Sequence, residues 1–480
     1  MYYQSTRGHQ DKITGSQAVI KGMSEDGGLF VPQTFPNLSW ENVRGKAYPE
    51  LVKIILSLYF PEFTEDQLNR IVRHYNKKFT KKIAPVRSFG KRSFLELYHG
   101  PTASFKDMAL TVLTEIVSVS HEVNNLASDI LVLVATSGDT GSAALHGFAG
   151  QEHAHINVFY PTNGVSEIQM RQMEAVNQPG AVTYAIEGNF DDAQKTVKEL
   201  FSDSAIKTLA SDKKINIMTA NSINIARLIS QIAYYFYSYD QLVNTGVIKA
   251  GESIDIAVPT GNFGDILAGI YAKQMGLPIE GAICASNSNN VLTDFFYTGV
   301  YNTNRDFVKT YSPSMDILIS SNLERFLHLI SSGNSQMIKE AYSALNQTGQ
   351  FIWSEGFPEY LQADFSNDEQ TLQGIQEVFV TDKYLIDPHT AVAYQASKLS
   401  TRHCLIVSTA SPYKFVDPVL QAIQLETSGT LQEKIYRLAE VTGTTIPESI
   451  VAIVNGDIQP KHIIDKMEIK DRVKELLEKR

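Results

Sequence analysis

Residues 128–150 read SDILVLVATSGDTGSAALHGFAG: a run of apolar residues, a loop of small and hydroxyl-bearing residues, and then a helical pattern. The same order returns in ESIDIAVPTGNFGDILAGIYAKQMG (252–276) and in RHCLIVSTASPYKFVDPVLQAI (402–423). Continuous apolar strands that alternate with helices are typical of a parallel sheet covered on both faces. We therefore expect an α/β fold whose ligand lies beyond the carboxyl ends of the strands, where these loops are.

The remaining segments extend this organisation. Further strand-like runs are INVFYP (156–161), AVTYAIEG (181–188), INIMTA (215–220) and EGAICAS (280–286). The first 85 residues lack such runs, and residues 41–60 and 64–79 instead carry apolar residues at helical spacing, with Thr64 as an N-cap. This pattern predicts a small helical N-terminal domain, and the charged C-terminal segment 461–480 predicts a surface helix.

Composition limits the function classes. The chain has 480 residues, 43% of them hydrophobic, and a formal net charge of −10, which argues against a general binder of nucleic acid or anionic membranes. It has no apolar run of about 18 residues, and its N-terminus has no apolar signal core. The two cysteines, Cys284 and Cys404, lie in separate apolar runs and are expected to be buried free thiols. We expect a cytoplasmic protein of two or three domains.

Two loops are candidates for ligand binding. In PTGNFGD (259–265) two glycines let the backbone N–H groups turn inward, and Asp265 opens a helix whose positive end faces the same point. The loop matches neither the nucleoside-triphosphate nor the dinucleotide pattern, so a small phosphate monoester fits it better. The loop ATSGDTGSAA (135–144) suits a carboxylate or a polar ring substituent. For each loop, a plain strand-to-helix connection is the alternative.

A lone lysine, Lys106, stands in YHGPTASFKDMAL (98–110), in the first turn of an expected helix that Thr102 or Ser104 can cap. A helix N-terminus disfavours positive charge and lowers the pKa of a lysine, so a neutral amine becomes accessible. A neutral amine forms a Schiff base with an aldehyde, whereas the alternative is a solvated lysine. A lysine, a phosphate cradle and a parallel sheet together match the needs of pyridoxal 5′-phosphate. The motifs H-E-x-x-H, C-x-x-C and G-x-S-x-G are absent, and no metal is expected.

These segments resemble the threonine synthase family of pyridoxal-phosphate enzymes (β-family, fold type II), in its longer bacterial and fungal branch. The resemblance covers HGPTASFKDMAL, ATSGDTGSAA and PTGNFGD, and also YQSTRG, GLFVP, IEGNFDDAQ (186–194), NSINIAR (221–227) and SPSMDILISSN (312–322). It implies two α/β domains with parallel-sheet cores plus a small helical N-terminal domain. The expected division is 1–90 for the helical domain, 91–120 with 215–480 for the larger cofactor-binding domain, and 121–214 for the smaller domain.

The resemblance also implies roles for individual residues. Lys106 would be the Schiff-base lysine, Asp139 would contact the ring hydroxyl, and Thr409 would face the pyridine nitrogen. The cofactor phosphate would be wrapped by Gly261, Asn262, Phe263, Gly264 and Asp265. The substrate-binding candidates are Ser137, Thr140, Asn224, Arg227 and Lys414. Many family members read TAHPAKF where this chain has TASPYKF, with Ser411 and Tyr413, so a histidine role at that place is not carried over.

The reaction that the resemblance implies is the conversion of O-phospho-L-homoserine and water to L-threonine and phosphate. Arg227 and Lys414 would supply local cations for the anionic substrate in an acidic protein. Three alternatives stay open: a phospho-lyase that stops after elimination and releases a 2-oxo acid, a serine/threonine dehydratase, and a non-catalytic binding module. The sequence predicts no oligomeric state.

Overall fold

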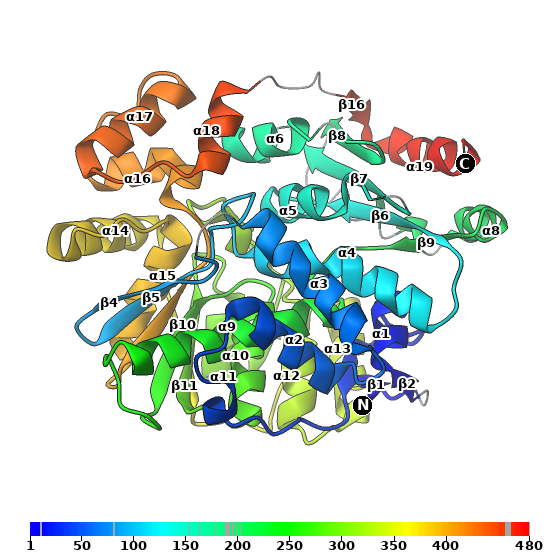
Figure 1. Ribbon diagram of the computed structural model, residues 1–480, viewed down its shortest axis with the longest axis horizontal. Coiled ribbons are helices and arrows are strands. Elements are labelled where there is room, and N and C mark those ends of the chain that lie inside the picture. Colours follow the sequence, from blue (N-terminus) through cyan, green and yellow to red (C-terminus); the bar gives the residue numbers. More distant parts are fainter. Residues whose placement is uncertain are drawn as a thin grey trace.

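A six-stranded sheet forms the larger half of the molecule (Figure 1). Its strands are parallel except for β4, which is antiparallel to β5. In spatial order they are β14 (Leu361–Phe365), β11 (Ile279–Ser286), β10 (Ile254–Pro259), β15 (Cys404–Ser408), β5 (Arg92–Glu96) and β4 (Val86–Phe89). Every residue of β10 and β15 is buried, as continuous apolar runs predict for central parallel strands.

A second, five-stranded sheet is entirely parallel. Its order is β16 (His462–Asp465), β8 (Ala181–Glu187), β7 (Ala154–Pro161), β6 (Asp129–Ala135) and β9 (Ile215–Met218). Two of these strands lie outside residues 121–214, the range expected for the smaller domain. The sequence analysis missed β16 altogether, because an isolated edge strand next to a charged helix has no turn signal of its own.

The N-terminal segment differs from the expectation of helices alone. β1 (Tyr2–Ser5) pairs antiparallel with β2 (Ile13–Thr14) and β3 (Phe30–Pro32) in a small sheet. These strands are too short to show an alternating pattern, and their pairing depends on distant residues. The expected helices are present as α2 (Tyr48–Tyr59) and α3 (Glu65–Lys78), and Thr64 caps α3 in a capping box with Gln67.

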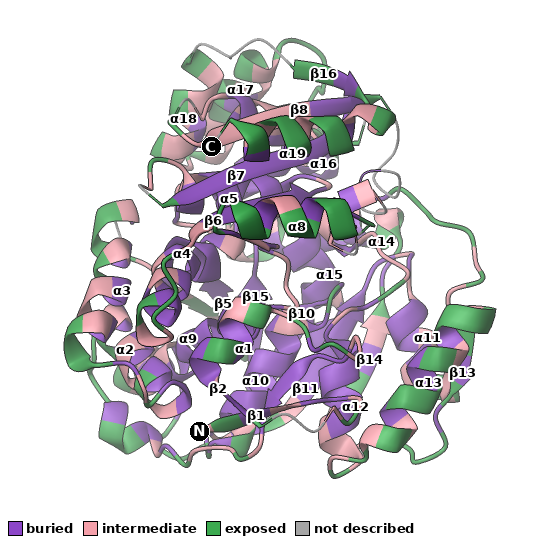
Figure 2. Ribbon diagram, turned by 90° about the vertical axis from the view of Figure 1, so that its right-hand side faces the viewer, coloured by how far each residue is buried: buried purple, intermediate pink, exposed green. Residues whose placement is uncertain are grey.

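Helices cover both sheets. The structure describes residues 1–9, 12–79, 82–151, 153–162, 164–176, 178–187, 193, 196–197, 199–201, 203–456 and 462–479. Buried residues gather in the strands and in helices such as α9, while α8 and α19 expose their outer faces (Figure 2). Cys284 and Cys404 are free and buried, as expected.

A two-stranded ribbon joins β12 (Val300–Asn302) and β13 (Gln350–Ile352). The other helices are α1 (Gly15–Lys21), α4 (Lys106–Val123), α5 (Asp139–Phe148), α6 (Glu167–Glu174), α8 (Ser204–Asp212), α9 (Ile225–Asn244), α10 (Gly264–Gln274), α11 (Val291–Thr298), α12 (Leu323–Ile330), α13 (Ser335–Thr348), α14 (Asp368–Asp382), α15 (Pro388–Ala396), α16 (Val416–Ala422), α17 (Leu431–Thr442), α18 (Glu448–Asn455) and α19 (Ile469–Glu478).

The parallel order of β10, β15 and β5 brings three loops to one edge. These strands end at Pro259, Ser408 and Glu96, so the segments after them leave the sheet on the same side. Those segments carry residues 260–265, Thr409 and Lys106. β6 of the other sheet ends at Ala135, just before the loop that leads to Asp139, the first residue of α5.

Candidate active site

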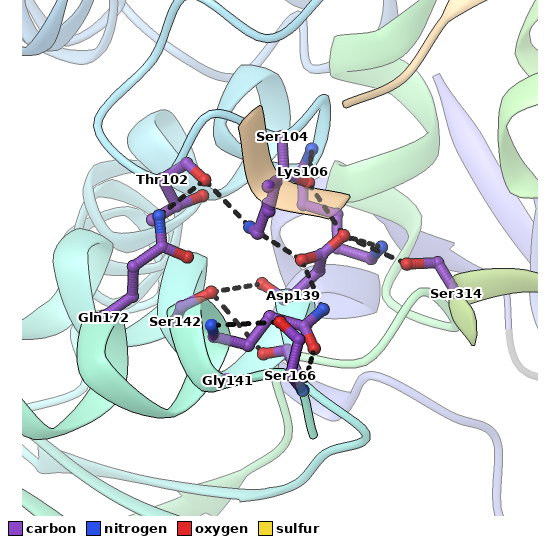
Figure 3. A network of polar contacts seen from close by, with 12 residues as sticks. Thr102, Ser104, Lys106, Asp139, Gly141, Ser142, Ser166, Gln172 and Ser314 are labelled. Atoms are coloured by element: carbon purple, nitrogen blue, oxygen red, sulfur yellow. Dashed lines mark hydrogen bonds and ion pairs between the residues drawn. The ribbon is translucent and has the colours of Figure 1, made fainter. Parts of the chain in front are cut away.

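The carboxylate of Asp139 is the centre of a buried polar network (Figure 3). Its Oδ1 lies 2.7 Å from Lys414 Nζ and accepts from Gln169 Nε2 at 2.9 Å. Its Oδ2 lies 3.5 Å from Lys106 Nζ and accepts from Ser314 Oγ at 3.0 Å. Burial alone would raise the pKa of Asp139, but the Lys414 and Lys106 ammonium groups hold it well below its usual range. Asp139 is therefore an anion that joins the two sheets.

The loop before Asp139 requires glycine at position 138. Gly138 has φ of +136°, and a Cβ there would come within 2.3 Å of the Gln169 side chain. The hydroxyl of Thr136 accepts from the N–H groups of Gly138 and Gly141, at 3.0 Å each. These two hydrogen bonds to the Thr136 side chain thus hold the loop in its conformation. Ser137 and Thr140 flank Asp139 in the chain and are both partly exposed.

Lys106 is the first residue of α4 and points toward Asp139 (Figure 3). The chain enters the helix beside β15, because Phe105 N–H donates to the Thr409 carbonyl at 2.7 Å. The Lys106 side chain is only 12% exposed. Burial lowers its pKa, helped by the nearby charges of Arg227 and Lys414 and opposed by Asp139. The expected direction is right, but the leading cause is burial rather than the helix dipole.

The expectation that Thr102 or Ser104 caps this helix is confirmed only for Ser104, whose Oγ accepts from the Lys106 N–H at 3.4 Å. Phe105 occupies the N-cap position and provides no side-chain cap. Thr102 instead donates its N–H and its hydroxyl to the Asp107 carboxylate, at 2.8 and 2.7 Å. Asp107 is fully buried, and burial raises its pKa to about 6. Asp107 thus anchors the turn that precedes Lys106, a role that the spacing of the sequence does not reveal.

Lys414 lies within the site, but its ammonium already has two acceptors. Besides the Asp139 contact, Nζ donates to the Thr102 carbonyl at 2.8 Å, and the side chain is completely buried. Thr102 also accepts from Gln172 Nε2 at 2.9 Å. These contacts favour a structural role for the Lys414 ammonium over the substrate-binding role expected from the sequence.

The loop 260–265 forms the expected turn, with a difference in its conformation. Phe263, and not Gly264, is left-handed, with φ of +60°, and caps α10, which begins at Gly264. Gly261 is needed for close approach, since a Cβ would lie 3.2 Å from Met315 Cα and from the Ser314 carbonyl. Within the described ranges, the backbone N–H groups of residues 261–264 donate to no protein acceptor. This is what an anion cradle requires.

The Asp265 side chain is occupied elsewhere. Its Oδ1 accepts from the hydroxyls of Tyr234 and Tyr235, at 2.5 and 2.7 Å. Burial raises the pKa of Asp265 to about 6, although both tyrosines lower it. At this position only the backbone is left for an anion.

The 409–415 segment follows β15 past Lys106. Thr409 is buried directly after the last residue of β15. Ser411 N–H donates to the Ala103 carbonyl at 3.1 Å, and the Tyr413 hydroxyl points away, to Thr444 at 2.7 Å. Ser411 and Tyr413 are the two departures from the family motif. Ser411 is thus held through its backbone, and the Tyr413 hydroxyl is bonded away from the site.

Asn224 and Arg227, two further candidates for substrate binding, differ in the hydrogen bonds that their side chains already make. Asn224 caps α9, and its Nδ2 donates to the Val19 carbonyl at 3.0 Å, so its side chain is committed to the fold. Arg227 is buried and donates from Nη1 to the Ala220 carbonyl at 2.9 Å. Its Nε is buried without a hydrogen-bond partner in the described structure, and burial lowers its pKa to about 10. Arg227 thus has a buried donor without a partner, whereas the Asn224 amide is anchored on the Val19 carbonyl.

The sequence analysis did not identify Gln169 or His389. Gln169 looks like an ordinary capping-box residue, and it does cap α6 with Ser166. His389 is buried, with Nδ1 2.6 Å from Asp387 Oδ2, and its Nε2 accepts from Ser314 N–H at 3.1 Å. Ser314 itself lies in the SPSMDILISSN segment, which could have indicated it. Most of IEGNFDDAQ (186–194) is outside the described residues.

Neither a membrane-spanning helix nor a metal cluster occurs among the described residues. None of the helices in the described ranges is long and apolar enough to cross a membrane. The same residues bring together no three histidine, cysteine or carboxylate side chains that could hold a metal ion.

Comparisons with known proteins place these features in a context. Residues 2–75 match the family model described as threonine synthase N terminus. The chain is 38% identical to threonine synthase of Schizosaccharomyces pombe over 86% of this chain and 87% of that protein. It is 35% identical to that of Saccharomyces cerevisiae, over 95% and 96% respectively. It is also 39% identical to human threonine synthase-like 1, over 88% of this chain but only 60% of the human protein's length.

Solved structures give the same result for the fold. A pyridoxal-phosphate-bound threonine synthase from Brucella melitensis superimposes with a TM-score of 0.88 at 31% identity, over 100% of this chain and 99% of the other. Yeast threonine synthase superimposes with a TM-score of 0.87 at 30% identity, over the same shares. The two-sheet architecture is therefore the fold type II arrangement that the sequence predicted.

Proposed function

Because this chain belongs to the threonine synthase family, we propose that it binds pyridoxal 5′-phosphate and converts O-phospho-L-homoserine and water to L-threonine and phosphate. One observation carries the proposal. A mostly buried lysine with a lowered pKa, Lys106, faces Asp139 at the sheet edge that also carries the loop 260–265, in which the N–H groups of residues 261–264 donate to no acceptor in the described part of the chain. An amine for the aldehyde and a cradle for the phosphate are the two anchors that this cofactor needs.

The residues present fit the cofactor. The N–H groups of residues 261–264 and the positive end of α10 would bind its phosphate, and Gly261 lets this loop lie close to the Ser314 and Met315 backbone. Asp139 would contact the ring hydroxyl, with its own charge balanced by Lys414. Thr409 would face the ring nitrogen. A hydroxyl cannot keep that nitrogen protonated as a carboxylate would, which favours elimination and replacement over transamination.

When bound, the cofactor supplies an electron sink for a carbanion next to the substrate's amino group. The chain then supplies proton transfer and charge. Lys106 Nζ, with its lowered pKa, takes and returns protons at Cα and Cβ of the substrate. Arg227, through its unpaired Nε, is the candidate for the substrate's phosphate, with Ser137 and Thr140 as neutral donors. Asn224 and Lys414 are weaker candidates for direct substrate binding, since Asn224 Nδ2 already donates to the Val19 carbonyl and Lys414 Nζ already has two partners within the fold.

The phospho-lyase alternative uses the same site and differs from the proposal only in the step after elimination. Elimination without water addition at Cβ would release phosphate, 2-oxobutyrate and ammonia, with one water consumed in freeing the nitrogen. The test is to supply pyridoxal phosphate and O-phospho-L-homoserine and to measure threonine, 2-oxobutyrate and phosphate together. Equal amounts of threonine and phosphate support the proposal, whereas 2-oxobutyrate with phosphate supports the lyase.

The setting of the enzyme is also a proposal. We place it in the cytoplasm, because both cysteines are buried as free thiols and a reducing compartment keeps them so. Its partner is the small-molecule substrate, and the acidic balance of the chain argues against nucleic acid.

A further inference from the structure

The loop 261–264 is held from outside by its carbonyl groups. Ser320 Oγ donates to the Gly261 carbonyl at 2.7 Å. Asn322 donates twice to the Asn262 carbonyl, from its backbone N–H at 3.0 Å and from Nδ2 at 3.1 Å. Both residues belong to the segment 312–322 that precedes α12. The backbone oxygens of the cradle thus have fixed partners.

Fixing the carbonyls also fixes the N–H groups. In a planar trans peptide, the carbonyl of one residue and the N–H of the next point in opposite directions. With the Gly261 and Asn262 carbonyls turned toward Ser320 and Asn322, the N–H groups of Asn262 and Phe263 must turn to the other side. Those two groups donate to no acceptor in the described part of the chain. Ser320 and Asn322, which together we call the brace, therefore orient these two N–H groups into the cradle.

The brace is in turn held by one arginine, Arg325, whose side chain is completely buried. Its Nη1 donates to Asn322 Oδ1 at 2.5 Å, which fixes the amide so that Nδ2 faces the Asn262 carbonyl. Its Nη2 donates to the Ile223 carbonyl at 2.6 Å, and its Nε donates to the Phe30 carbonyl at 2.9 Å. All three acceptors are neutral, and no carboxylate among the described residues pairs with this guanidinium. Three hydrogen bonds to neutral acceptors, rather than an ion pair, thus hold the Arg325 side chain in place.

The third acceptor connects the site to the N-terminal segment. Phe30 opens β3, which pairs with β1, and β1 and α12 lie at the same end of the molecule in both views (Figures 1 and 2). A second link between these parts is independent of the cradle. Arg7 donates from Nε and Nη2 to Glu324, at 2.9 and 2.8 Å.

We infer that Arg325 is a positioning residue for phosphate recognition: through Asn322 it orients the 261–264 cradle, and through Phe30 it makes that orientation depend on the N-terminal sheet. The inference rests on the proposed function, in which this cradle binds the cofactor phosphate. It assigns the N-terminal segment a part in cofactor binding that its distance in sequence from the cradle does not suggest.

The test compares two ligands that differ only in the phosphate. The dissociation constants of pyridoxal 5′-phosphate and of pyridoxal are measured by absorbance titration of the apoprotein for the wild type, Arg325→Lys and Asn322→Asp. The lysine keeps the charge but cannot reach three acceptors. The aspartate still accepts from Arg325 but turns an acceptor toward the Asn262 carbonyl. Arg7→Gln is the matched control, since it cuts the other link between the same two parts.

Both test variants should lose the preference for the phosphorylated ligand by about tenfold or more, while pyridoxal binding and the control stay near wild type. Equal loss for both ligands, or an unchanged preference in a folded variant, would overturn the inference. A folded Asn322→Asp protein decides the matter if Arg325→Lys fails to fold. Wild-type protein that binds neither ligand would instead contradict the proposed function.

Discussion

At the scale of single residues, the proposed function makes the chemistry depend on the Lys106 amine, which no other side chain type can replace. Arginine keeps the positive charge but does not bond to an aldehyde, because its guanidinium stays protonated. We expect Lys106→Arg to fold normally and to show no turnover above the assay background. The measurement is phosphate release from O-phospho-L-homoserine, with circular dichroism as the check on folding. Appreciable turnover by the variant would show that a different group does this chemistry.

Asp107 gives a pH prediction at the same scale. Its folded pKa of about 6 lies above the ordinary value of 3.8, so the folded protein binds more protons between about pH 4 and 6. This contribution to the unfolding free energy is fully present below pH 4 and is lost as the pH rises through 6, by up to about 3 kcal/mol. Asp107→Asn can still accept from the Thr102 N–H and should flatten this decline. Urea unfolding at several pH values measures it, with the exposed Asp66→Asn as control; parallel curves for wild type and Asp107→Asn would refute the assignment.

At the scale of elements, the strands β6, β10 and β15 and the loops of the site were predictable, whereas β5 and the bracing contacts were not. The apolar runs at 254–259 and 404–408 are buried central strands, so their pattern alone indicated a parallel sheet and the edge at which ligands bind. The anchoring of Asp107 on Thr102, the left-handed Phe263 and the role of Arg325 depend on neighbours in space that no local pattern encodes. The strands β1 and β16 were missed for the same reason.

The cradle provides the prediction for this scale. A valine at Gly261 would place its Cβ 3.2 Å from the backbone of Ser314 and Met315, and Ser314 is itself held by hydrogen bonds to Asp139 and His389. We expect Gly261→Val to weaken pyridoxal phosphate binding by at least about tenfold while the fold persists. Titration of the apoprotein together with a thermal melt separates the two effects. A folded variant with wild-type affinity would mean that the phosphate binds elsewhere.

At the scale of the whole molecule, the two sheets meet through charge. Asp139 comes from the five-stranded half, and its partner Lys414 comes from the six-stranded half, where it is completely buried. Removing one partner of a buried pair leaves the other charge uncompensated, at a cost of about 3–5 kcal/mol. We expect Asp139→Asn to lower the unfolding free energy by about that amount and Asp139→Asn with Lys414→Met to recover most of it. Urea unfolding of both variants measures this, and a double variant no more stable than the single one would contradict it.

The most direct test of the central claim is to locate the cofactor bond. Wild-type protein loaded with pyridoxal phosphate is reduced with borohydride, digested and mapped by mass spectrometry. The account predicts one modified peptide, carrying the pyridoxyl group on Lys106 in the segment 98–110. A label on another lysine, or a loaded protein that borohydride leaves unmodified, would contradict it.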